Sequence, residues 1–220
     1  MGFRTAVERK RVYWNARRAW VFELAEVLAF SFLFTAGAGA QAARARAQIV
    51  QPVDPANRVV LRGNIPPLAR AEDDRGAAPD GLPLNRMLLV LKRPPEQEAA
   101  LRELLVEQQV KSSPNYHRWL TPAQFGNQFG PADTDIQAVS DWLNSQGFEI
   151  DHVAAGQSVI EFSGAAALVR EAFHTGIHQF VVNGSAYWSN ADNPQIPAAL
   201  APAVAGIASL SGHFLIFLSG

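Results

Sequence analysis

One apolar run constrains the fold more than any other feature of this 220-residue chain: Met87-Leu88-Leu89-Val90-Leu91. Charged residues flank the run on both sides, and Pro94-Pro95 follows it closely. A short, unbroken apolar run between charged residues and a proline pair is typical of a strand that is buried on both faces. We therefore expect a central strand here, in a sheet covered by other layers.

Further along the chain, apolar residues recur at helical spacing. The first such segment opens at Pro95, a residue suited to the first helical position, and continues toward Val110. We expect this helix to cover one face of the sheet. Thr121-Pro122-Ala123-Gln124 has the capping-box pattern, in which two side chains bond the free backbone N–H groups of a helix start. A short helix carrying Phe125 and Phe129 should follow.

Two more helices are predicted beyond the break at Gly130-Pro131. Asp133 or Thr134 should cap the first of them, and Gly147 should end it. Its inner side is predicted to consist of Ile136, Val139, Trp142 and Leu143. Ser163 should cap the second helix, and Gly176 should stop it.

The remaining regular segments alternate or cluster apolar residues as strands do. The predicted strands are residues 148–153 and 159–162, joined by a turn around Gly156, residues 177–182 and 185–188, joined by Asn183-Gly184, and residues 204–210 at a sheet edge. Asn-Gly is a strong signal for a two-residue hairpin because both turn positions need a positive φ.

The order strand, helix, helix, hairpin, helix, strand indicates an α+β fold. Helices that cover one face of an antiparallel sheet, with a repeated strand-helix-strand order, favour a ferredoxin-like arrangement. We expect this domain to span residues 84–211.

Three segments resemble a known family. They are Ser112-Ser113-Pro114-Asn115-Tyr116-His117-Arg118-Trp119-Leu120-Thr121-Pro122-Ala123-Gln124-Phe125, then Arg86-Met87-Leu88-Leu89-Val90-Leu91-Lys92-Arg93, and Gln128-Phe129-Gly130-Pro131. Together they are similar to the activation domain of the sedolisin and kumamolisin family of serine-carboxyl peptidases, with likeness from about Arg58 to Leu210. The resemblance implies a propeptide of the same α+β type, which precedes a catalytic domain that this chain is too short to contain.

The N-terminal 40 residues have the order of a secretory signal peptide. A basic lead is followed by the apolar run Val27 to Thr35 and by the small residues Ala38-Gly39-Ala40. We expect cleavage after Ala40 and a secreted or periplasmic location. Two other interpretations remain open here: a single membrane anchor, and a buried amphipathic helix of a cytoplasmic protein.

The segments that flank the predicted domain have a different composition. Residues 41–83 are rich in Ala, Arg, Asp, Gly and Pro, so we expect an extended, partly mobile lead-in. Within it, Val59-Val60-Leu61 should dock on the domain edge or remain loose. Residues 212–220 form an apolar tail, Gly212-His213-Phe214-Leu215-Ile216-Phe217-Leu218-Ser219-Gly220, which we interpret as a sign of truncation.

Charge and composition exclude several classes of function. The formal net charge is -1, and residues 41–220 hold 13 Lys and Arg against 17 Asp and Glu. A nucleic-acid partner is therefore not expected, and contact with a membrane is expected only through the signal peptide. The absence of cysteine rules out disulfides and thiolate metal sites. No cofactor or metal site is predicted, and His174 and His178 are interpreted as ordinary histidines because Gly176 separates them.

The resemblance implies that catalysis would need a Ser-Gly-Thr-Ser motif and a Glu and Asp one helical turn apart. Neither pattern occurs in the chain, since no Glu has an Asp four positions later. We therefore expect no catalytic residues and no peptidase activity of its own.

Tyr116, His117 and Trp119 form the candidate partner interface. Two interpretations of this aromatic loop are open. In one, Trp119 and Leu120 fill the gap between the first helix and the sheet. In the other, part of the loop faces the mature peptidase.

The resemblance also implies a function. Propeptides of this family act as folding chaperones and inhibitors of the catalytic domain and are removed by acid-triggered cleavage, so that catalytic domain is the expected partner. Because the chain ends early, we weigh a remnant without its enzyme, an inhibitor or chaperone acting in trans, and an unrelated secreted binding module. Acid would neutralise carboxylates such as Glu149, Asp151, Glu161 and Glu171 and charge His117, His174 and His178.

Overall fold

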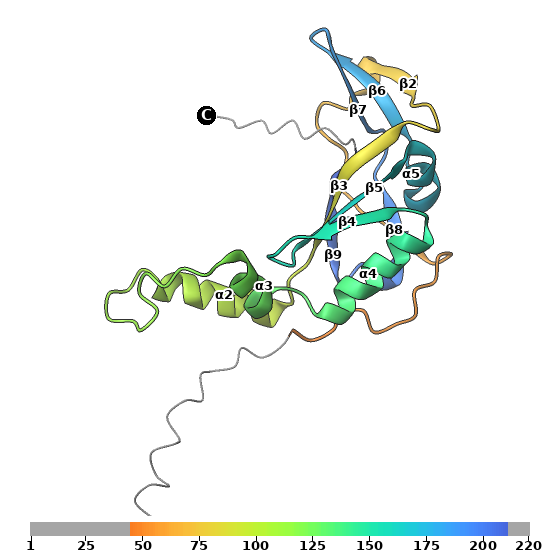
Figure 1. Cartoon of the computed structure of the whole chain (residues 1–220). Coiled ribbons are helices and arrows are strands. Elements are labelled where there is room, and N and C mark those ends of the chain that lie inside the picture. The colour runs from red at the N-terminus through yellow and green to blue at the C-terminus, as the bar shows by residue number, and fades with distance from the viewer. Residues whose placement is uncertain (1–44, 211–220) are drawn as a thin grey trace, which may run out of the picture. The chain divides into compact units, whose positions relative to one another are not determined.

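The computed structural model of the chain describes residues 45–210 (Figure 1). The predicted signal segment 1–40, its cleavage site after Ala40 and the tail 212–220 lie outside the described residues. The α+β class is confirmed: the described residues contain four α-helices and antiparallel sheets. No helix in the described part of the chain is both long enough and apolar enough to cross a membrane.

A four-stranded antiparallel sheet forms the centre of the domain, in the order β4-β5-β3-β9. Its strands are β4 (Glu149–Val153), β5 (Val159–Ala165), β3 (Pro83–Leu91) and β9 (Val204–Ser209). The central position of β3 is confirmed because β5 and β9 both pair with it, and β9 lies at the predicted edge. Burial on both faces of β3 is only partial: Met87 and Leu89 are fully buried, whereas Leu88 and Val90 on the opposite face are half-buried.

Helices α4 (Asp133–Ser145) and α5 (Ala166–Phe173) pack on β4 and β5 and close the core. Trp142 of α4 meets Phe173 of α5 edge to face, with ring centroids 5.3 Å apart. The predicted inner side of α4 is confirmed, since Val139, Trp142 and Leu143 are buried and Ile136 packs against the core.

The predicted caps of these two helices are wrong. The residue before α4 is Ala132, so Asp133 and Thr134 already lie inside the helix. Ser163 lies in β5, where its hydroxyl donates to the Asp151 carboxylate at 2.6 Å instead of capping α5. Helix α5 ends at Phe173 with His174 in the left-handed conformation (φ 50°), so Gly176 is not its stop. Strand β5 continues past the predicted cap because β3 pairs with it as far as Ala165.

The second hairpin is confirmed but belongs to another sheet. Strands β6 (Ile177–Val182) and β7 (Ser185–Asn190) are joined by Asn183 and Gly184, both with positive φ. Strand β2 (Asp74–Ala77) pairs with β6, which gives a three-stranded sheet in the order β2-β6-β7. Short 3₁₀ turns occur at Ala71–Asp73 and Ala198–Leu200.

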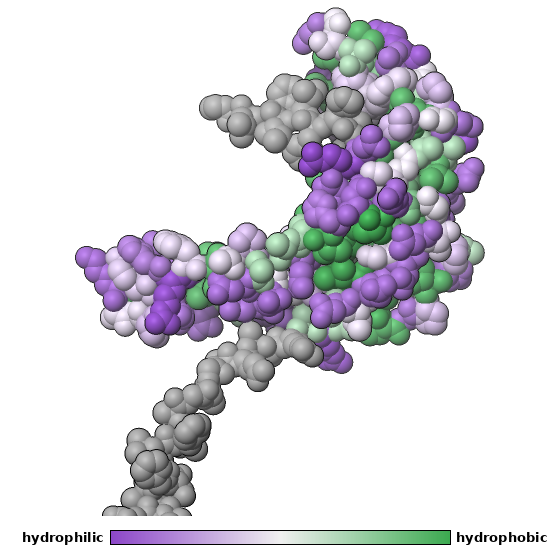
Figure 2. Space-filling model, in the orientation of Figure 1, coloured by the Kyte–Doolittle hydropathy of each residue, from purple (hydrophilic) through white to green (hydrophobic). Residues whose placement is uncertain are grey.

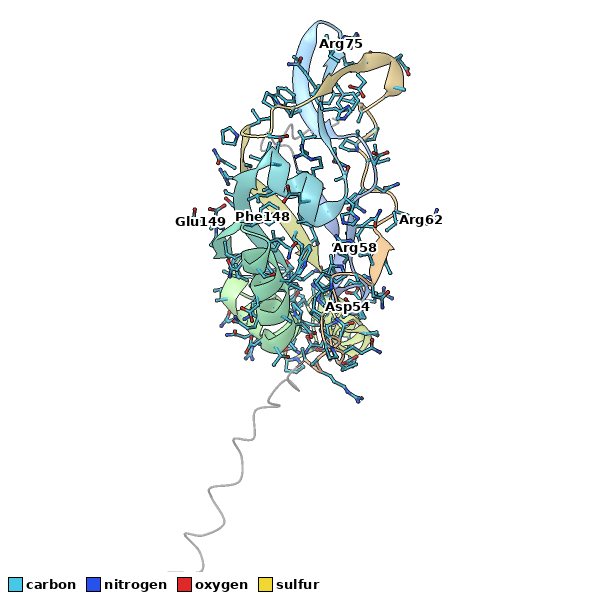
Figure 3. All side chains as sticks on the ribbon, turned by 90° about the vertical axis from the view of Figure 1, so that its right-hand side faces the viewer. Asp54, Arg58, Arg62, Arg75, Phe148 and Glu149 are labelled. Atoms are coloured by element: carbon cyan, nitrogen blue, oxygen red, sulfur yellow. The ribbon has the colours of Figure 1, made fainter. Side chains whose placement is uncertain are left out.

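The described lead-in residues run along the domain and pair with it. Strand β1 (Arg58–Val60) pairs with β8 (Gln195–Pro197), and the following Leu61 is buried in the core. Arg58 is labelled in Figure 3. Its guanidinium donates to the Gln195 carbonyl at 3.0 Å and also to the Ala172 carbonyl near the end of α5. The predicted docking of Val59-Val60-Leu61 on the domain edge therefore occurs. The domain boundary at Leu84 stays a prediction.

Helix α2 (Pro95–Glu107) does not cover the sheet, contrary to the prediction. It packs instead against α3 (Pro122–Phe129), and the two helices lie side by side beyond the end of β3 (Figure 1). Pro94 has an extended backbone, so the chain leaves the sheet before the helix starts. Leu105 and Val106 are exposed because α2 has no sheet beneath it.

Candidate partner interface

The three predicted interface residues lie in the loop between α2 and α3. We refer to α2, residues 108–121 and α3 together as the arm. The capping box is confirmed at the far side of this loop: the Gln124 backbone N–H donates to Thr121 Oγ1 at 3.2 Å, and the Thr121 N–H donates to Gln124 Oε1 at 2.9 Å. The loop therefore has a fixed exit into α3.

Hydrogen bonds fold the loop back onto the end of α2. The Gln108 side chain is buried, and its Nε2 donates to the Arg118 carbonyl. The Gln108 carbonyl accepts from the His117 N–H at 3.2 Å, and Asn115 Nδ2 donates to the Glu107 carboxylate. His117 takes the left-handed conformation, with φ 54°, which a non-glycine residue adopts only where its surroundings impose it.

This fold stacks the predicted interface residues on one another. The Tyr116 and His117 rings have centroids 3.8 Å apart and an interplanar angle of 19°. The His117 and Trp119 centroids are 5.8 Å apart at 21°. Trp119 is 65% exposed. The three rings form what we call the aromatic stack, in which Tyr116 is half-buried and His117 and Trp119 are exposed.

The interpretation in which Trp119 fills a gap between the first helix and the sheet is therefore wrong. The loop folds over the end of α2, and α2 itself does not lie on the sheet, so no gap of that kind exists for Trp119. Leu120 is half-buried. The structure thus removes one of the two interpretations of the loop, whereas a contact with the peptidase stays a prediction.

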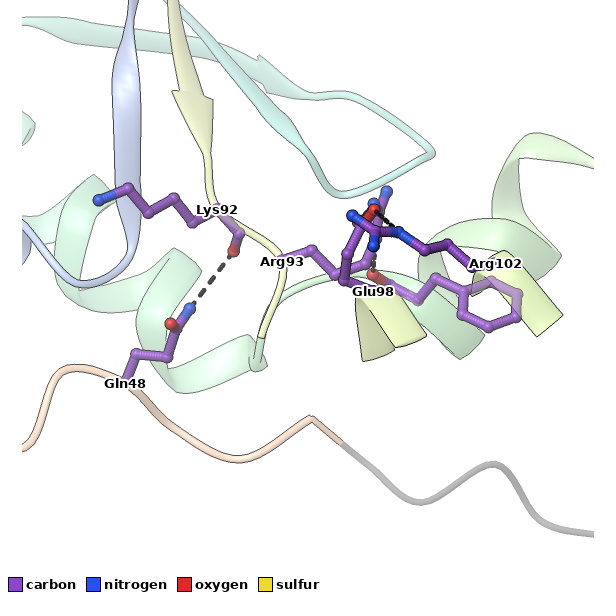
Figure 4. A network of polar contacts seen from close by, with 6 residues as sticks. Gln48, Lys92, Arg93, Glu98 and Arg102 are labelled. Atoms are coloured by element: carbon purple, nitrogen blue, oxygen red, sulfur yellow. Dashed lines mark hydrogen bonds and ion pairs between the residues drawn. The ribbon is translucent and has the colours of Figure 1, made fainter. Parts of the chain in front are cut away.

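Arg93 attaches the arm to the end of β3. Its Nε donates to the Phe129 carbonyl at 2.8 Å, and its Nη1 lies 2.6 Å from Oε2 of Glu98 (Figure 4). Its guanidinium also stands over the Phe125 ring, 5.2 Å from the centroid. The hydrogen bond from Arg93 holds the pKa of Glu98 below its ordinary value. One side chain therefore joins both helices of the arm to the sheet.

Gly126 in α3 and Gly130 just after it provide a second attachment, against the turn between β4 and β5. A Cβ atom at Gly126 would lie 2.4 Å from the Ala155 carbonyl oxygen, and one at Gly130 would lie 2.6 Å from Gln157 Oε1. Backbone can approach backbone this closely only where a side chain is missing. The backbone of α3 therefore lies directly against the turn between β4 and β5.

The surface of the arm combines exposed apolar and basic side chains. Leu105, Val106 and Val110 are exposed together with Trp119. Lys111 and Arg118 are exposed as well, and neither makes an ion pair within residues 45–210. Hydrophilic residues dominate the face of the arm that Figure 2 shows. Such a mixture of aromatic, aliphatic and cationic groups is typical of a protein interface.

The other residues considered from the sequence lie apart from the arm. His174 follows the last residue of α5, and His178 in β6 pairs through Nδ1 with Asp74 at 2.8 Å, so the two histidines do not share a helix. Glu161 pairs with Arg86 at 2.9 Å. Within the described residues, no three His, Asp or Glu side chains are grouped to hold a metal.

Sequence reasoning missed Arg93 and the exposed apolar residues of α2. A signal for the latter exists in the run Leu104-Leu105-Val106, because three consecutive residues of a helix cannot all face one side. No comparable signal marks Arg93, whose role depends on a contact with Phe129, 36 residues further along the chain.

Comparison with known proteins identifies the class of protein. Residues 72–212, more than half of the chain, match the family model described as "Pro-kumamolisin, activation domain", and the chain belongs to this family. This confirms the resemblance seen in the three sequence segments, all of which lie inside the matched range.

Two curated relatives are similar to part of the chain. The chain is 30% identical over 113 residues to sedolisin from Pseudomonas sp. (strain 101), and 31% identical over 111 residues to xanthomonalisin from Xanthomonas sp. (strain T-22). The matched regions cover 51% and 50% of this chain but only 19% and 13% of the relatives. The match thus spans less than a fifth of the length of each relative.

Proposed function

We propose that this domain is the propeptide of a serine-type endopeptidase and binds the catalytic domain of that enzyme. The family match over residues 72–212 carries this proposal. A propeptide role needs no catalytic residues, which agrees with the lack of the Ser-Gly-Thr-Ser motif in the sequence. The function would then be to assist folding of the catalytic domain and to inhibit it, in cis or in trans.

Surface complementarity would have to supply both effects. A preformed template lowers the entropic cost of organising a large, slowly folding enzyme. The arm suits this role because two independent attachments, at Arg93 and at Gly126, hold it in place. Export through the N-terminal signal pattern would bring the domain to the compartment of a secreted peptidase.

We also infer a ferredoxin-like plan for the central sheet. In chain order its strands are β3, β4, β5 and β9, with α4 before β4 and α5 after β5. The first and third of these strands occupy the middle of the sheet, and the second and fourth occupy its edges. Strands β6, β7 and β8 would then be an insertion before the last strand.

Release by acid is the second part of the proposal. Three carboxyls have pKa values below their ordinary range: half-buried Asp74 through the Gly76 N–H and His178, exposed Asp80 through Arg170, and half-buried Glu98 through Arg93. A lowered folded-state pKa stabilises the fold above the ordinary pKa, and this stabilisation is lost as pH falls through the folded-state value. Acid would thus loosen the domain and expose it to cleavage.

Inhibition of a related enzyme tests the proposal. The full 220-residue chain is mixed with purified mature sedolisin, and peptide hydrolysis is measured at several pH values. We expect inhibition that weakens in acid as the chain is cleaved. Trp142→Ala, which should destabilise the core, is the control at a urea concentration that unfolds this variant but not the wild type, because an unfolded chain competes only as a substrate. Equal inhibition by both chains, or none by either against both sedolisin and xanthomonalisin, would rule the function out.

A further inference from the structure

We propose that the end of the arm is a docking surface for an apolar recess bordered by carboxylates on the peptidase catalytic domain. The surface consists of the aromatic stack, one exposed aliphatic residue and two cations that make no ion pair within residues 45–210, namely Tyr116, His117, Trp119, Val110, Lys111 and Arg118. This inference rests on the proposed function and specifies which part of the domain binds and what chemistry it binds.

The residue types favour a protein partner. Trp, Tyr and Arg are the residues that most often dominate the binding energy of protein interfaces. Trp119 is 65% exposed, so most of its ring is available for burial. A ring of this size in a surface loop, together with exposed Val110 (45%), leaves apolar area that a partner could remove from water.

The order of the stack favours tight binding. The centroid of the His117 ring lies 3.8 Å from that of Tyr116 and 5.8 Å from that of Trp119. Gln108 holds the backbone here, because its carbonyl accepts from the His117 N–H and its Nε2 donates to the Arg118 carbonyl. Side chains that are already in place lose little conformational freedom on binding. The arm therefore presents its rings without a large ordering cost.

Charge selects the chemistry of the partner. Residues 108–121 contain Lys111 and Arg118 and no acidic residue, whereas residues 41–220 as a whole have more acidic than basic residues. Neither cation is neutralised by an ion pair among the described residues. Complementary potentials steer association and fix register, so the matching surface should carry carboxylates.

Binding measurements with the full chain test this assignment, with immobilised sedolisin whose active site has been blocked as the probe. We expect Trp119→Ala to weaken binding about 30-fold, as truncation of a central aromatic does. Arg118→Glu and Lys111→Glu should each weaken it about tenfold and reduce its salt dependence. Matched controls are Val60→Ala, an exposed apolar residue in β1, and Arg62→Glu, an exposed cation outside the arm; both should bind as the wild type does.

Cross-linking identifies the contact directly. The chain has three lysines, of which Lys92 and Lys111 lie in the described part, and Lys92 Nζ donates to the Ala201 carbonyl at 2.8 Å. A carbodiimide joins an amine to a carboxylate it touches, so Lys111 should couple to an Asp or Glu of sedolisin, and Lys92 should not. Circular dichroism of each variant confirms that the fold is kept.

The outcomes separate the two proposals. If the wild type binds sedolisin but the arm variants bind equally well, the docking surface is wrong and the propeptide function stands. If the wild type does not bind sedolisin or xanthomonalisin at all, both proposals fail. Binding of a cell-wall glycan that Trp119→Ala abolishes would replace the protein partner with a sugar ligand and overturn the inference.

Discussion

Two tryptophans of this chain have opposite surroundings. Trp142 is 4% exposed and packs its edge on Phe173, whereas Trp119 is 65% exposed and stacks on His117. Burial of a large aromatic is worth several kcal/mol, and exposed rings contribute little of this. The same residue type therefore supports the fold in one place and is free for binding in the other.

We expect Trp142→Ala to lower the free energy of unfolding by about 3–5 kcal/mol, since it removes a core ring and leaves a cavity. Trp119→Ala should change it by less than about 1 kcal/mol. Urea unfolding followed by far-UV circular dichroism measures both. A large loss of stability for Trp119→Ala would mean that the ring is buried in solution, contrary to the structure.

Asp135 is the buried acid of α4, and it connects this helix to the lead-in. The carboxylate is fully buried and accepts from the Gln48 N–H at 2.9 Å and from the Ile49 N–H at 2.9 Å. Two backbone donors of an extended segment are thereby satisfied by one side chain. Together with Ile49 and Val53, which pack against the core, this contact holds the lead-in on the domain surface.

Asp135→Ala should cost about 1–3 kcal/mol, because it leaves two backbone donors without their acceptor. Amide hydrogen exchange at Gln48 and Ile49 should become much faster. Asp133→Ala is the control: Asp133 lies in the same helical turn but is exposed, so only its favourable effect on the helix dipole, below about 1 kcal/mol, is lost. Equal effects of the two substitutions would contradict the role given to Asp135.

At the level of elements, the position of the arm is set by its contacts with the rest of the domain and not by burial of its own side chains. Helix α2 buries only Gln97 among its residues, so its packing alone cannot hold it. The Arg93 contacts and the close approach of α3 to the β4–β5 turn fix its position. Long-range contacts of this kind link the end of β3, the arm and the hairpin into one unit.

Gly126→Ala tests this attachment. The new methyl group would overlap the Ala155 carbonyl, 2.4 Å away, so the turn or α3 has to shift at a cost of about 1–3 kcal/mol. Amide exchange in α3 and in residues 154–157 should increase, while exchange in β3 and β5 stays slow. Gly81→Ala, which meets no atom within 4 Å, should leave exchange unchanged. Unaltered exchange in α3 of the Gly126 variant would show that α3 does not pack closely against the turn between β4 and β5.

For the whole molecule, acid is expected to lower stability. Asp74, Asp80 and Glu98 all have lowered pKa values, so their contribution is present above their ordinary pKa of about 4 and is lost as pH falls through the lower folded-state values. The groups around Asp74 are His178, Arg75 and the Gly76 N–H.

The triple variant Asp74→Asn, Asp80→Asn, Glu98→Gln should be less stable than the wild type at about pH 7 and should lose less stability between about pH 7 and about pH 3. Thermal unfolding midpoints across this range measure the difference. If the wild type and the variant showed parallel pH profiles, these three carboxyls would not be responsible for acid sensitivity.

Local sequence was sufficient for most elements. The Asn183-Gly184 turn, the Thr121 capping box and the periodicity of α4 each depend on neighbours within a few residues, so their positions could be predicted. The predicted helix caps at Asp133 and Ser163 were wrong for two reasons. Asp133 already lies inside α4, and the Ser163 hydroxyl donates to Asp151 of another strand.

What the amino-acid order alone established is the family, the α+β class and the loop that holds Tyr116, His117 and Trp119, since all three are carried by local motifs and periodicity. Only the three-dimensional packing decided that α2 leaves the sheet, that Trp119 is exposed, and that the second hairpin joins β2 in a separate sheet. These features depend on pairings between residues far apart in the chain, such as Arg93 with Phe129 and Asp74 with Phe180, and local patterns contain no information on such pairings.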